Sequence, residues 1–325
     1  MDVIDYSVVI RTTGKAGPKY AKLLESIEGL IPRPREVIVV LPEGYSLPPE
    51  RLGWETFYFC PKGMVAQRLF GIVQCKTPYA LITDDDIAFS SDFVQKLYQP
   101  VADGSFGLSA GPLLEFFPRK GIKAFFWALG AAAVPTVWHK NHYTTVLHSS
   151  GYSYNRNVDL SRKEPYEAQT AAWTCFFADV EKLRSIHFED EVWLDRLGYS
   201  AHDDTAMFYK AWLRGIKTGI VPLAVYQHLD GKTSTKGRSV AVEKATGFTR
   251  FVFWYRFIFQ QSTGIEKIWS IVCIGYRMIF QIMCDFIRCC AGKRSFDEVS
   301  AYISGIIEGL RWVKKGKFKE LPPVV

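Results

Sequence analysis

Residues Tyr79–Ile87 read YALITDDDI, a short apolar run that ends directly in three aspartates. An apolar run of this length predicts a strand that is buried on both faces of a sheet. Earlier in the chain, Tyr6–Arg11 and Glu36–Leu41 are two further strand-like apolar runs, and Tyr20–Leu30 and Val65–Cys75 read as helices between them. Strand, helix, strand, helix, strand is typical of a mostly parallel sheet flanked by helices, so the sequence predicts an α/β fold.

The elements that follow the aspartates extend the same pattern. Ala172–Val180 reads as a strand that leads into a short helix, Asp204–Arg214 as a helix with an apolar face, and Thr218–Val225 as a final strand shortly before His228. Open α/β sheets bind their ligands at the carboxyl ends of the strands. The three aspartates fall at such an end, so we expect a ligand site there.

Composition places the chain among folded proteins with a sizeable core. Of its 325 residues, 48% are hydrophobic and 22% are charged, unlike the composition of disordered chains. The net charge is +7, but basic and acidic residues are interspersed over most of the chain, so we predict no nucleic-acid partner. The first residues do not resemble a secretory signal and the seven cysteines lack CxxC spacing, so we expect a cytoplasmic protein without a disulfide framework or structural zinc.

The triplet Asp84, Asp85 and Asp86 carries the clearest chemical signal. Adjacent carboxylates repel one another unless they are solvated, paired with cations or bound to a metal. Oxygen ligands of this kind suit Mg²⁺ or Mn²⁺, and magnesium sites commonly combine one or two carboxylates with the phosphates of a substrate. The alternative is a solvated acidic turn, or a cap for a helix over Ser90–Tyr98.

Four segments together resemble the family 2 glycosyltransferases, which are inverting enzymes of the GT-A fold that use nucleotide-sugar donors. They are SVVIRTT, GMVAQRLFGI, YALITDDDI and HDDTAMFYKAWLRGIKTGIVPLAVYQH, and the resemblance runs from about Tyr6 to Asp230. The last segment matches the family's acidic pair, its helix with a basic residue and glycine, and its proline-containing strand that ends in histidine. The resemblance implies a Rossmann-like GT-A sheet and a Mn²⁺ or Mg²⁺ cofactor.

The resemblance also implies which residues bind the nucleotide-sugar donor. Thr12 and Thr13 would line the nucleotide pocket, and Arg68 would approach the nucleotide or its diphosphate. Asp84 and Asp85 would face the ribose and the diphosphate.

The same resemblance implies which other residues bind the metal and which one catalyses the reaction. Asp86 and His228 match metal ligands, Asp204 matches the catalytic base, and Trp173 is placed to stack on a sugar face. Each has a simpler alternative: Asp204 and its neighbour Asp203 can cap the helix that they open, and His228 can be a surface histidine.

Two positions depart from the family's pattern. The acidic residue that reads the nucleotide base usually follows the second strand directly, whereas here Leu41 and Pro42 follow and Glu43, the candidate for this donor-binding position, comes later. Arg68 is followed by Leu69 where asparagine is common. A further acidic run, Glu189–Glu191, reads as a solvated loop and is the reserve candidate for the base.

We divide the chain into a catalytic domain over residues 1–240 and a C-terminal helical region over residues 241–325. The second region mixes aromatic with basic residues, and Arg277 and Asp285 interrupt its longest apolar stretch, which argues against a clean membrane span. Two interpretations remain: a helix that lies in the membrane interface, and a helical pair that packs its apolar face on the catalytic domain. The apolar segment Ala124–Val137 is too short to span a bilayer and is expected to be buried or interfacial.

These observations predict a metal-dependent inverting glycosyltransferase of the hexosyltransferase kind, acting in cell-surface polysaccharide or glycolipid synthesis. Its predicted partners are a nucleotide-sugar donor and a carbohydrate or lipid-linked acceptor, with peripheral contact to the inner face of the plasma membrane through the C-terminal region. One alternative is a nucleotidyltransferase, although Arg11–Gly17 (RTTGKAG) is a poor match to a glycine-rich triphosphate loop. The other is a non-catalytic membrane-associated scaffold with a degenerate transferase core.

Overall fold

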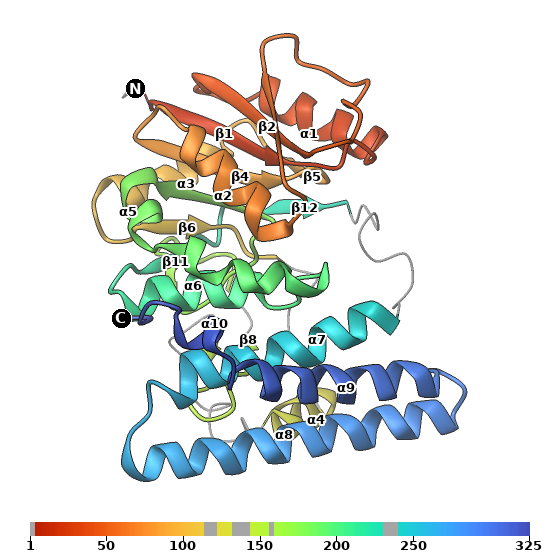
Figure 1. The fold of residues 1–325 in the computed structure, drawn as a ribbon. Helices are drawn as coiled ribbons and strands as arrows, with labels where there is room; N and C mark the ends of the chain where they lie inside the picture. Colours follow the sequence, from red (N-terminus) through yellow and green to blue (C-terminus); the bar gives the residue numbers. More distant parts are fainter. Residues whose placement is uncertain (1–3, 114–121, 132–143, 156–158, 230–239) are drawn as a thin grey trace.

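An eight-stranded sheet forms the centre of the protein (Figure 1). The structure is a computed structural model that describes residues 4–113, 122–131, 144–155, 159–229 and 240–325. In spatial order the strands are β3 (Thr56–Cys60), β2 (Glu36–Pro42), β1 (Tyr6–Arg11), β4 (Tyr79–Asp84), β10 (Cys175–Asp179), β6 (Leu108–Ala110), β11 (Thr218–Ile220) and β9 (Tyr166–Ala168).

Most of the strand pairs in this sheet are parallel. β1 pairs in parallel with β2 and β4, as do β2 with β3 and β6 with β11. β10 runs antiparallel to β4 and β6, and β9 runs antiparallel to β11. Two short antiparallel ribbons stand apart from the sheet: β5 (Ile87–Phe89) with β12 (Tyr226–His228), and β7 (Thr144–Val146) with β8 (Ser153–Asn155).

Helices flank the sheet and extend beyond it at the C-terminal end (Figure 1). Those before the last quarter of the chain are α1 (Pro18–Glu28), α2 (Met64–Gln74), α3 (Phe93–Ala102), α4 (Ile122–Gly130), α5 (Val180–Ser185), the 3₁₀-helix η3 (Phe188–Leu197) and α6 (Asp203–Leu213). The remainder are α7 (Val240–Phe253), the π-helical η4 (Trp254–Phe259), α8 (Gly264–Cys290), α9 (Phe296–Trp312) and α10 (Gly316–Lys319). The predicted α/β class, with a mostly parallel sheet and a C-terminal helical appendage, is confirmed.

The alternation of side chains along β1 explains why helices cover both faces. Val8 and Ile10 belong to one hydrophobic cluster with Tyr20 of α1, whereas Val9 belongs to the opposite cluster with Val65 of α2. All of these side chains are almost completely buried. A strand that is covered on both faces has no polar side, which is why these strands read as continuous apolar runs.

The C-terminal helices share a core with the sheet. Phe248 of α7 and Trp312 of α9 lie in the same cluster as Val9, and the ring of Trp312 lies 5.8 Å from that of Trp193 in η3. The second predicted region thus packs against the catalytic part. Removing residues 241–325 would therefore expose to water the apolar side chains of the catalytic part that these helices cover.

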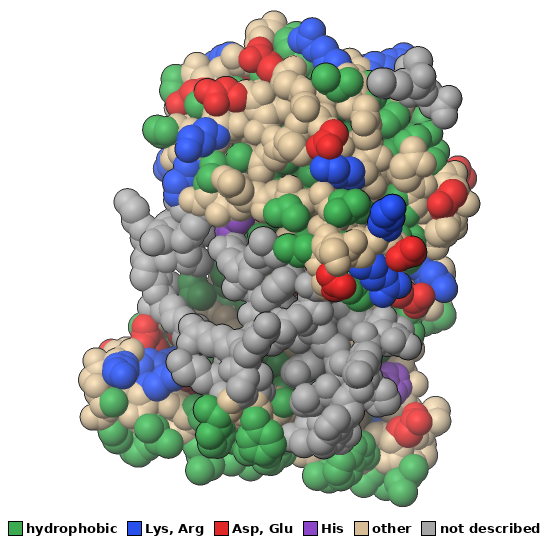
Figure 2. All heavy atoms as spheres, turned by 180° about the vertical axis from the view of Figure 1, so that it is seen from behind, with side chains coloured by type: hydrophobic (Ala, Val, Ile, Leu, Met, Phe, Trp, Pro, Cys, Tyr) green, Lys and Arg blue, Asp and Glu red, His purple; other side chains and the backbone are tan. Residues whose placement is uncertain are grey.

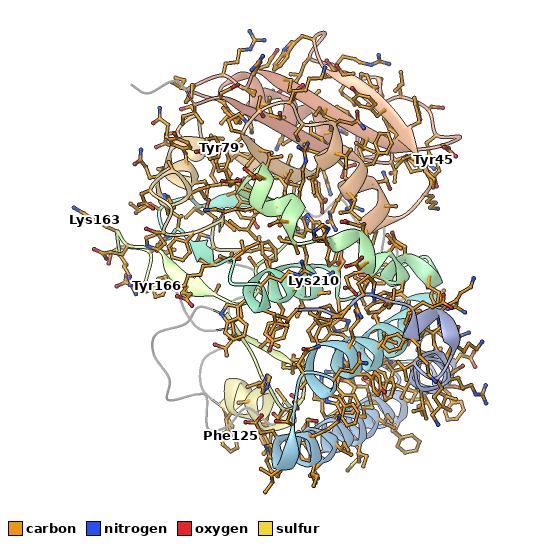
Figure 3. All side chains as sticks on the ribbon, turned by 60° about the vertical axis from the view of Figure 1, so that its left-hand side comes forward. Tyr45, Tyr79, Phe125, Lys163, Tyr166 and Lys210 are labelled. Atoms are coloured by element: carbon orange, nitrogen blue, oxygen red, sulfur yellow. The ribbon has the colours of Figure 1, made fainter. Side chains whose placement is uncertain are left out.

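A buried ion network reinforces this junction. Lys210 of α6, which lies in the interior (Figure 3), donates to Asp190 and to Glu191, each over 2.9 Å. Arg256 of η4 binds both oxygens of Glu191 over 2.8 Å. The expected solvated loop over Glu189–Glu191 is therefore wrong for Glu191, which is fully buried, because cations from two distant helices neutralise its charge.

Two strand predictions also need correction. The expected strand Thr218–Val225 is split: β11 ends at Ile220, and β12 begins only at Tyr226. Pro222 lies between them, and proline cannot donate a ladder hydrogen bond. The short strands β3, β5 and β6 were not predicted, because three to five residues give too little periodicity.

The helix α8 exposes its apolar side. In the described part of the chain it is the one helix long and apolar enough to cross a membrane, and 28% of its most apolar window is buried. Between Ile268 and Ile287 its only charged residues are Arg277 and Asp285, and both are buried. Of the apolar segment Ala124–Val137, residues up to 131 are described and form α4 with the turn after it; residues 132–137 lie outside the described residues.

Candidate active site

The carboxyl ends of β1 and β4 hold the centre of the site. In the parallel register Arg11 lies beside Asp84, and Arg11 Nε donates to Asp84 Oδ1 over 3.1 Å. Arg68 of α2 reaches the same carboxylate, with Nη2 lying 3.1 and 3.2 Å from its two oxygens. Asp84 is therefore an ion-paired aspartate held by two guanidinium groups, and a contact with the donor ribose stays a prediction.

Arg68 also links this strand end to the helix α6. Its Nη1 forms an ion pair with Asp203, the first residue of that helix. Its guanidinium carbon lies 4.6 Å from the ring centre of Trp173, whose side chain is 2% exposed. The ring of Trp173 thus packs against Arg68, and its predicted stacking on a sugar stays a prediction.

The helix that carries Arg68 is capped by a carboxylate from a distant segment. Asp195 of η3 accepts hydrogen bonds from the backbone N–H groups of Val65 and Ala66 over 3.1 and 3.0 Å. These are donors of the first turn, which have no partner within the helix. A carboxylate at this end also complements the helix dipole. A side chain at Gly63 would overlap Asp195, so the glycine permits this cap from a distant segment.

Asp85 is held by a hydroxyl group rather than by a guanidinium group. Thr12 Oγ1 donates to Asp85 Oδ2 over 2.5 Å, and the same hydroxyl accepts from the N–H of Gly14 over 2.9 Å. Burial raises the pKa of Asp85 to about 6, with the charges of Asp84 and Asp86 adding to the effect. Thr12 is itself 2% exposed, so it holds Asp85 in place at the end of β1.

The third aspartate of the triplet meets the predicted histidine. β5 pairs with β12 so that Ile87 lies opposite His228, and the N–H of Leu229 donates to the backbone oxygen of Asp86 over 2.7 Å. His228 Nε2 then lies 3.4 Å from Asp86 Oδ2, and the two side chains are 20% and 11% exposed. The structure brings together the two residues that were predicted as metal ligands.

The acidic pair at the start of α6 completes the site. Asp204 Oδ1 accepts from the N–H of Thr205 over 2.6 Å. Burial and then the charge of Asp203 raise the pKa of Asp204 to about 7. Burial also raises the pKa of Asp203, against the opposing effect of Arg68. One carboxylate of the pair is thus ion-paired, and the other has a pKa close to neutral pH, where a general base works best.

The remaining predicted donor residues lie at the ends of the first two strands. Thr13 follows β1 and is partly exposed; Glu43 follows β2 and is exposed. Tyr45, which was not predicted, lies beside them (Figure 3). Its ring lies 5.1 Å from Lys15 Nζ and 5.5 Å from Lys62 Nζ. An aromatic residue two positions after Glu43, in a turn after an apolar strand, was the available signal.

The charge balance of the site favours a cation. Five aspartates, which are Asp84, Asp85, Asp86, Asp203 and Asp204, face two arginines, Arg11 and Arg68. Arg11 pairs with Asp84, and Arg68 pairs with Asp84 and Asp203, so Asp86 and His228 are the pair placed to hold a metal. Among the described residues no group of three or more His, Cys, Asp or Glu side chains could hold a metal, so a metal here would need further ligands from substrate or water.

No protein-family model matches the chain, and no curated protein matches it. Among solved structures it is similar to GalNAc-T7 with UDP, GalNAc and Mn²⁺, with a TM-score of 0.49 and 14% identity over 88% of this chain and 57% of that one. It is also similar to the mannosyltransferase PcManGT from Pyrobaculum calidifontis in complex with GDP-Man and Mn²⁺, with a TM-score of 0.48 and 14% identity over 95% and 88%. This chain thus spans little more than half the length of the GalNAc-T7 chain, and neither neighbour assigns it a substrate or a residue role.

Proposed function

We propose that this protein is a metal-dependent inverting glycosyltransferase that moves a sugar from a nucleotide-sugar onto an acceptor hydroxyl. The proposal depends on one observation: a pair of metal-type ligands, Asp86 and His228, lies at the same sheet edge as a carboxylate whose pKa is about 7, Asp204. Arg68 connects the two halves, since it binds both Asp84 and Asp203. Metal ligands suit a diphosphate leaving group, and a carboxylate of this pKa suits deprotonation of an alcohol.

The cation would be Mn²⁺ or Mg²⁺, held by Asp86 and His228. A mixed oxygen and nitrogen pair that leaves positions for phosphate and water is compatible with both ions, and the imidazole favours manganese over magnesium. When bound, the ion neutralises charge on the departing diphosphate. The excess of carboxylates over arginines around it would be balanced by that ion.

Two further tasks, binding the nucleoside and positioning the aspartates, are assigned to other side chains of the site. The nucleoside is assigned to Thr13, Glu43 and Tyr45 at the ends of β1 and β2, with Lys15 and Lys62 beside the tyrosine ring. The tyrosine offers a flat surface for a nucleobase, and the two lysines bring positive charge beside it. Thr12, Arg11 and Arg68 act indirectly, because each holds one of the aspartates in a single orientation.

Asp204 would take the proton of the acceptor hydroxyl as that oxygen attacks the anomeric carbon. A single displacement of this kind inverts the configuration of that carbon. Asp203 cannot share the role while Arg68 binds it, and Asp190 is bound to Lys210 in the interior. The acceptor hydroxyl would be a carbohydrate or part of a lipid-linked glycan, consistent with polysaccharide or glycolipid synthesis.

A thermal-shift panel tests the proposal. Nucleoside diphosphates should raise the melting temperature only when Mn²⁺ or Mg²⁺ is present, because a ligand that binds the native state stabilises it. Asp86→Ala should abolish this shift, whereas Asp92→Ala, at an aspartate before α3 whose side chain is 50% exposed, should not. Stabilisation by nucleoside triphosphates without sugar transfer would favour a nucleotidyltransferase, and no binding of metal or nucleotide would favour a scaffold.

The location we propose is the inner face of the plasma membrane, with α8 lying in the interface. The exposed residues on α8 between Ile268 and Ile287 are all apolar: Ile268, Trp269, Ile271, Val272, Tyr276, Ile279, Met283, Phe286 and Ile287. They recur at helical spacing and form one stripe, while the polar residues Ser270, Arg277 and Asp285 face the protein. This is the reverse of a helix on a water-soluble protein, whose polar side faces out.

The neighbouring helix α4 continues this surface. Ile122, Phe125 and Phe126 are exposed by 72%, 51% and 54%, and Figure 2 shows hydrophobic side chains gathered along the lower edge of the molecule, where Figure 1 places α8 and α4. Figure 3 labels Phe125 at the same edge. Contiguous apolar surface of this kind marks a membrane or protein contact. The basic residues Arg288 and Lys293 at the end of α8 favour an anionic bilayer.

Vesicle sedimentation tests this location with the full chain. The protein should bind phosphatidylcholine vesicles that contain phosphatidylglycerol, and Ile279→Glu should release it, because the new charge would have to enter the apolar layer. Val73→Glu is the matched control, since Val73 of α2 is equally exposed but lies on the catalytic part. Equal vesicle binding by both variants would contradict the location.

A further inference from the structure

The strand that carries His228 lies outside the main sheet. β12 pairs with β5 in a separate two-stranded ribbon, in which His228 lies opposite Ile87 (Figure 1). A two-stranded ribbon of three residues on each side has little stability of its own. The distance of 3.4 Å between His228 Nε2 and Asp86 Oδ2 therefore depends on contacts that hold this ribbon against the rest of the protein.

Tyr226, the first residue of β12, anchors the ribbon in the core. It is 4% exposed and belongs to the same hydrophobic cluster as Ile10 of β1 and Leu81 of β4. The ring of Phe93 in α3 meets the tyrosine ring edge-on, with the two ring centres 6.0 Å apart. Side chains two positions apart in a strand point to the same side, so Tyr226 and His228 share one face of β12.

A glycine in the main sheet lets the chain before β12 come this close. Gly111 follows β6, and a side chain there would overlap the backbone oxygen of Ala224. The same added carbon would lie 2.9 Å from Cδ1 of Tyr226, which is closer than two such atoms can pack. A glycine within or beside a strand is typical of a place where another backbone approaches closely. The position of Tyr226 is therefore set by close packing against the sheet.

The hydroxyl of Tyr226 connects the ribbon to the strand end that carries the aspartates. It shares a hydrogen bond of 2.8 Å with Thr174 Oγ1. The backbone oxygen of Thr174 accepts from the N–H of Asp84 over 2.8 Å. The carbonyl before it, that of Trp173, accepts from Arg68 Nη2 over 3.4 Å. The segment Trp173–Thr174 thus joins the ribbon to Asp84 and to Arg68.

We propose that Tyr226 and Thr174 are positioning residues for the metal, and that their hydrogen bond holds His228 in place beside Asp86. The N–H of Leu229 ties the end of β12 to the backbone oxygen of Asp86 over 2.7 Å. The Tyr226 hydroxyl ties the start of the same strand to Thr174, so His228 lies between two fixed points. Ligands that are already in place bind a metal more tightly than ligands that must first be ordered. The inference rests on the proposed function, which takes Asp86 and His228 as the metal ligands.

The test measures binding of Mn²⁺ alone, so it does not depend on sugar transfer. The ion is titrated into the full-length protein and the free ion is followed by electron paramagnetic resonance, with Asp86→Ala showing which part of the binding belongs to this site. Tyr226→Phe and Thr174→Val each remove one hydroxyl at nearly constant shape, and each should raise the dissociation constant for Mn²⁺ about tenfold. Thr174→Ser keeps the hydroxyl and should bind like the wild type. The double variant should be no weaker than either single one, because both remove the same hydrogen bond.

Tyr6→Phe is the matched control for a merely structural effect. Tyr6 is fully buried in the same hydrophobic cluster and donates to the backbone oxygen of Pro32 over 2.7 Å, at the end of β1 that lies away from the site. Both phenylalanine variants should lower the melting temperature to a similar extent, but only Tyr226→Phe should weaken Mn²⁺ binding. A second measurement needs no metal: hydrogen exchange of the Leu229 N–H, followed by NMR, should be faster in Tyr226→Phe and unchanged in Tyr6→Phe.

Three outcomes would overturn the inference and leave the proposed function standing. They are wild-type affinity for Mn²⁺ in both Tyr226→Phe and Thr174→Val, an equal loss of affinity in Tyr6→Phe, and unchanged exchange of the Leu229 N–H in Tyr226→Phe. The second would show that affinity follows stability, and the third that the hydroxyl does not hold the ribbon. Absence of Mn²⁺ binding from the wild type would instead refute the proposed metal site, and this inference with it.

Discussion

Replacing Asp204 with asparagine tests the assignment of the general base most directly. The amide has nearly the same shape as the carboxylate, and its oxygen can still accept the hydrogen bond that Thr205 N–H makes over 2.6 Å. It cannot accept a proton at neutral pH. Loss of a general base lowers the rate about 10²–10⁴-fold, so we expect that loss in kcat with the affinity for the donor nearly unchanged.

The raised pKa of Asp204 adds two predictions about pH. Because this pKa is about 7, the fraction of ionised base falls as pH drops below 7, and kcat/KM of the wild type should fall with it. The folded state also holds this proton more tightly than the unfolded state, where the pKa is near 3.8. The contribution of Asp204 to stability is therefore most favourable below about pH 4 and declines as pH rises to about 7.

Asparagine does not titrate, so the variant should gain stability relative to the wild type across this range. A difference of about 3 pKa units corresponds to an upper limit on the order of 4 kcal/mol. Urea unfolding of both proteins at pH 5 and pH 8, without metal, measures the gain, and a radiolabelled-sugar assay measures turnover. Near-normal turnover in Asp204→Asn together with a dead Asp203→Asn or Asp190→Asn would show that the base is misassigned; activity in all three would refute the inverting mechanism.

The other site and packing contacts give further predictions. His228→Ala should weaken Mn²⁺-dependent nucleotide binding, as is expected of Asp86→Ala, and calorimetric titration with Mn²⁺ and nucleoside diphosphate measures it. Arg68→Gln should destabilise the fold by about 3–5 kcal/mol in urea unfolding, because it removes a buried cation from two carboxylates; an unchanged midpoint would contradict the bridge. Gly305→Ala should lower stability by about 1–3 kcal/mol, since its methyl would overlap a backbone oxygen of α7, whereas Gly275→Ala, with open space around it, should be neutral or stabilising.

The local sequence pattern was sufficient to predict the strands in the first half of the sheet and the carboxylates at its edge. The runs at Tyr6–Arg11, Glu36–Leu41 and Tyr79–Thr83 predicted three buried strands, and the structure has a strand at each. Strands covered on both faces must be apolar throughout, so the sequence shows them without any knowledge of their partners. The position of Asp86 after the third run followed directly from this.

Tertiary structure alone decided which side chains meet. His228 reaches Asp86 because β12 leaves the main sheet and pairs with β5, a three-residue strand that no periodicity could reveal. Arg68 of α2 meets Asp203 of α6, while Asp195 of η3 caps the helix that carries the arginine. Such contacts depend on register and on packing between distant segments, and neither leaves a local pattern.

The same limit applies to the C-terminal helices. The sequence showed that this region was apolar, aromatic and interrupted by Arg277 and Asp285, which left packing and membrane contact as equal alternatives. The structure shows both kinds of face: α7 and α9 pack into the core, whereas α8 turns Arg277 and Asp285 inward and its apolar stripe outward. Periodicity fixes which residues share a face of a helix, but only the surrounding structure determines whether that face is buried or exposed.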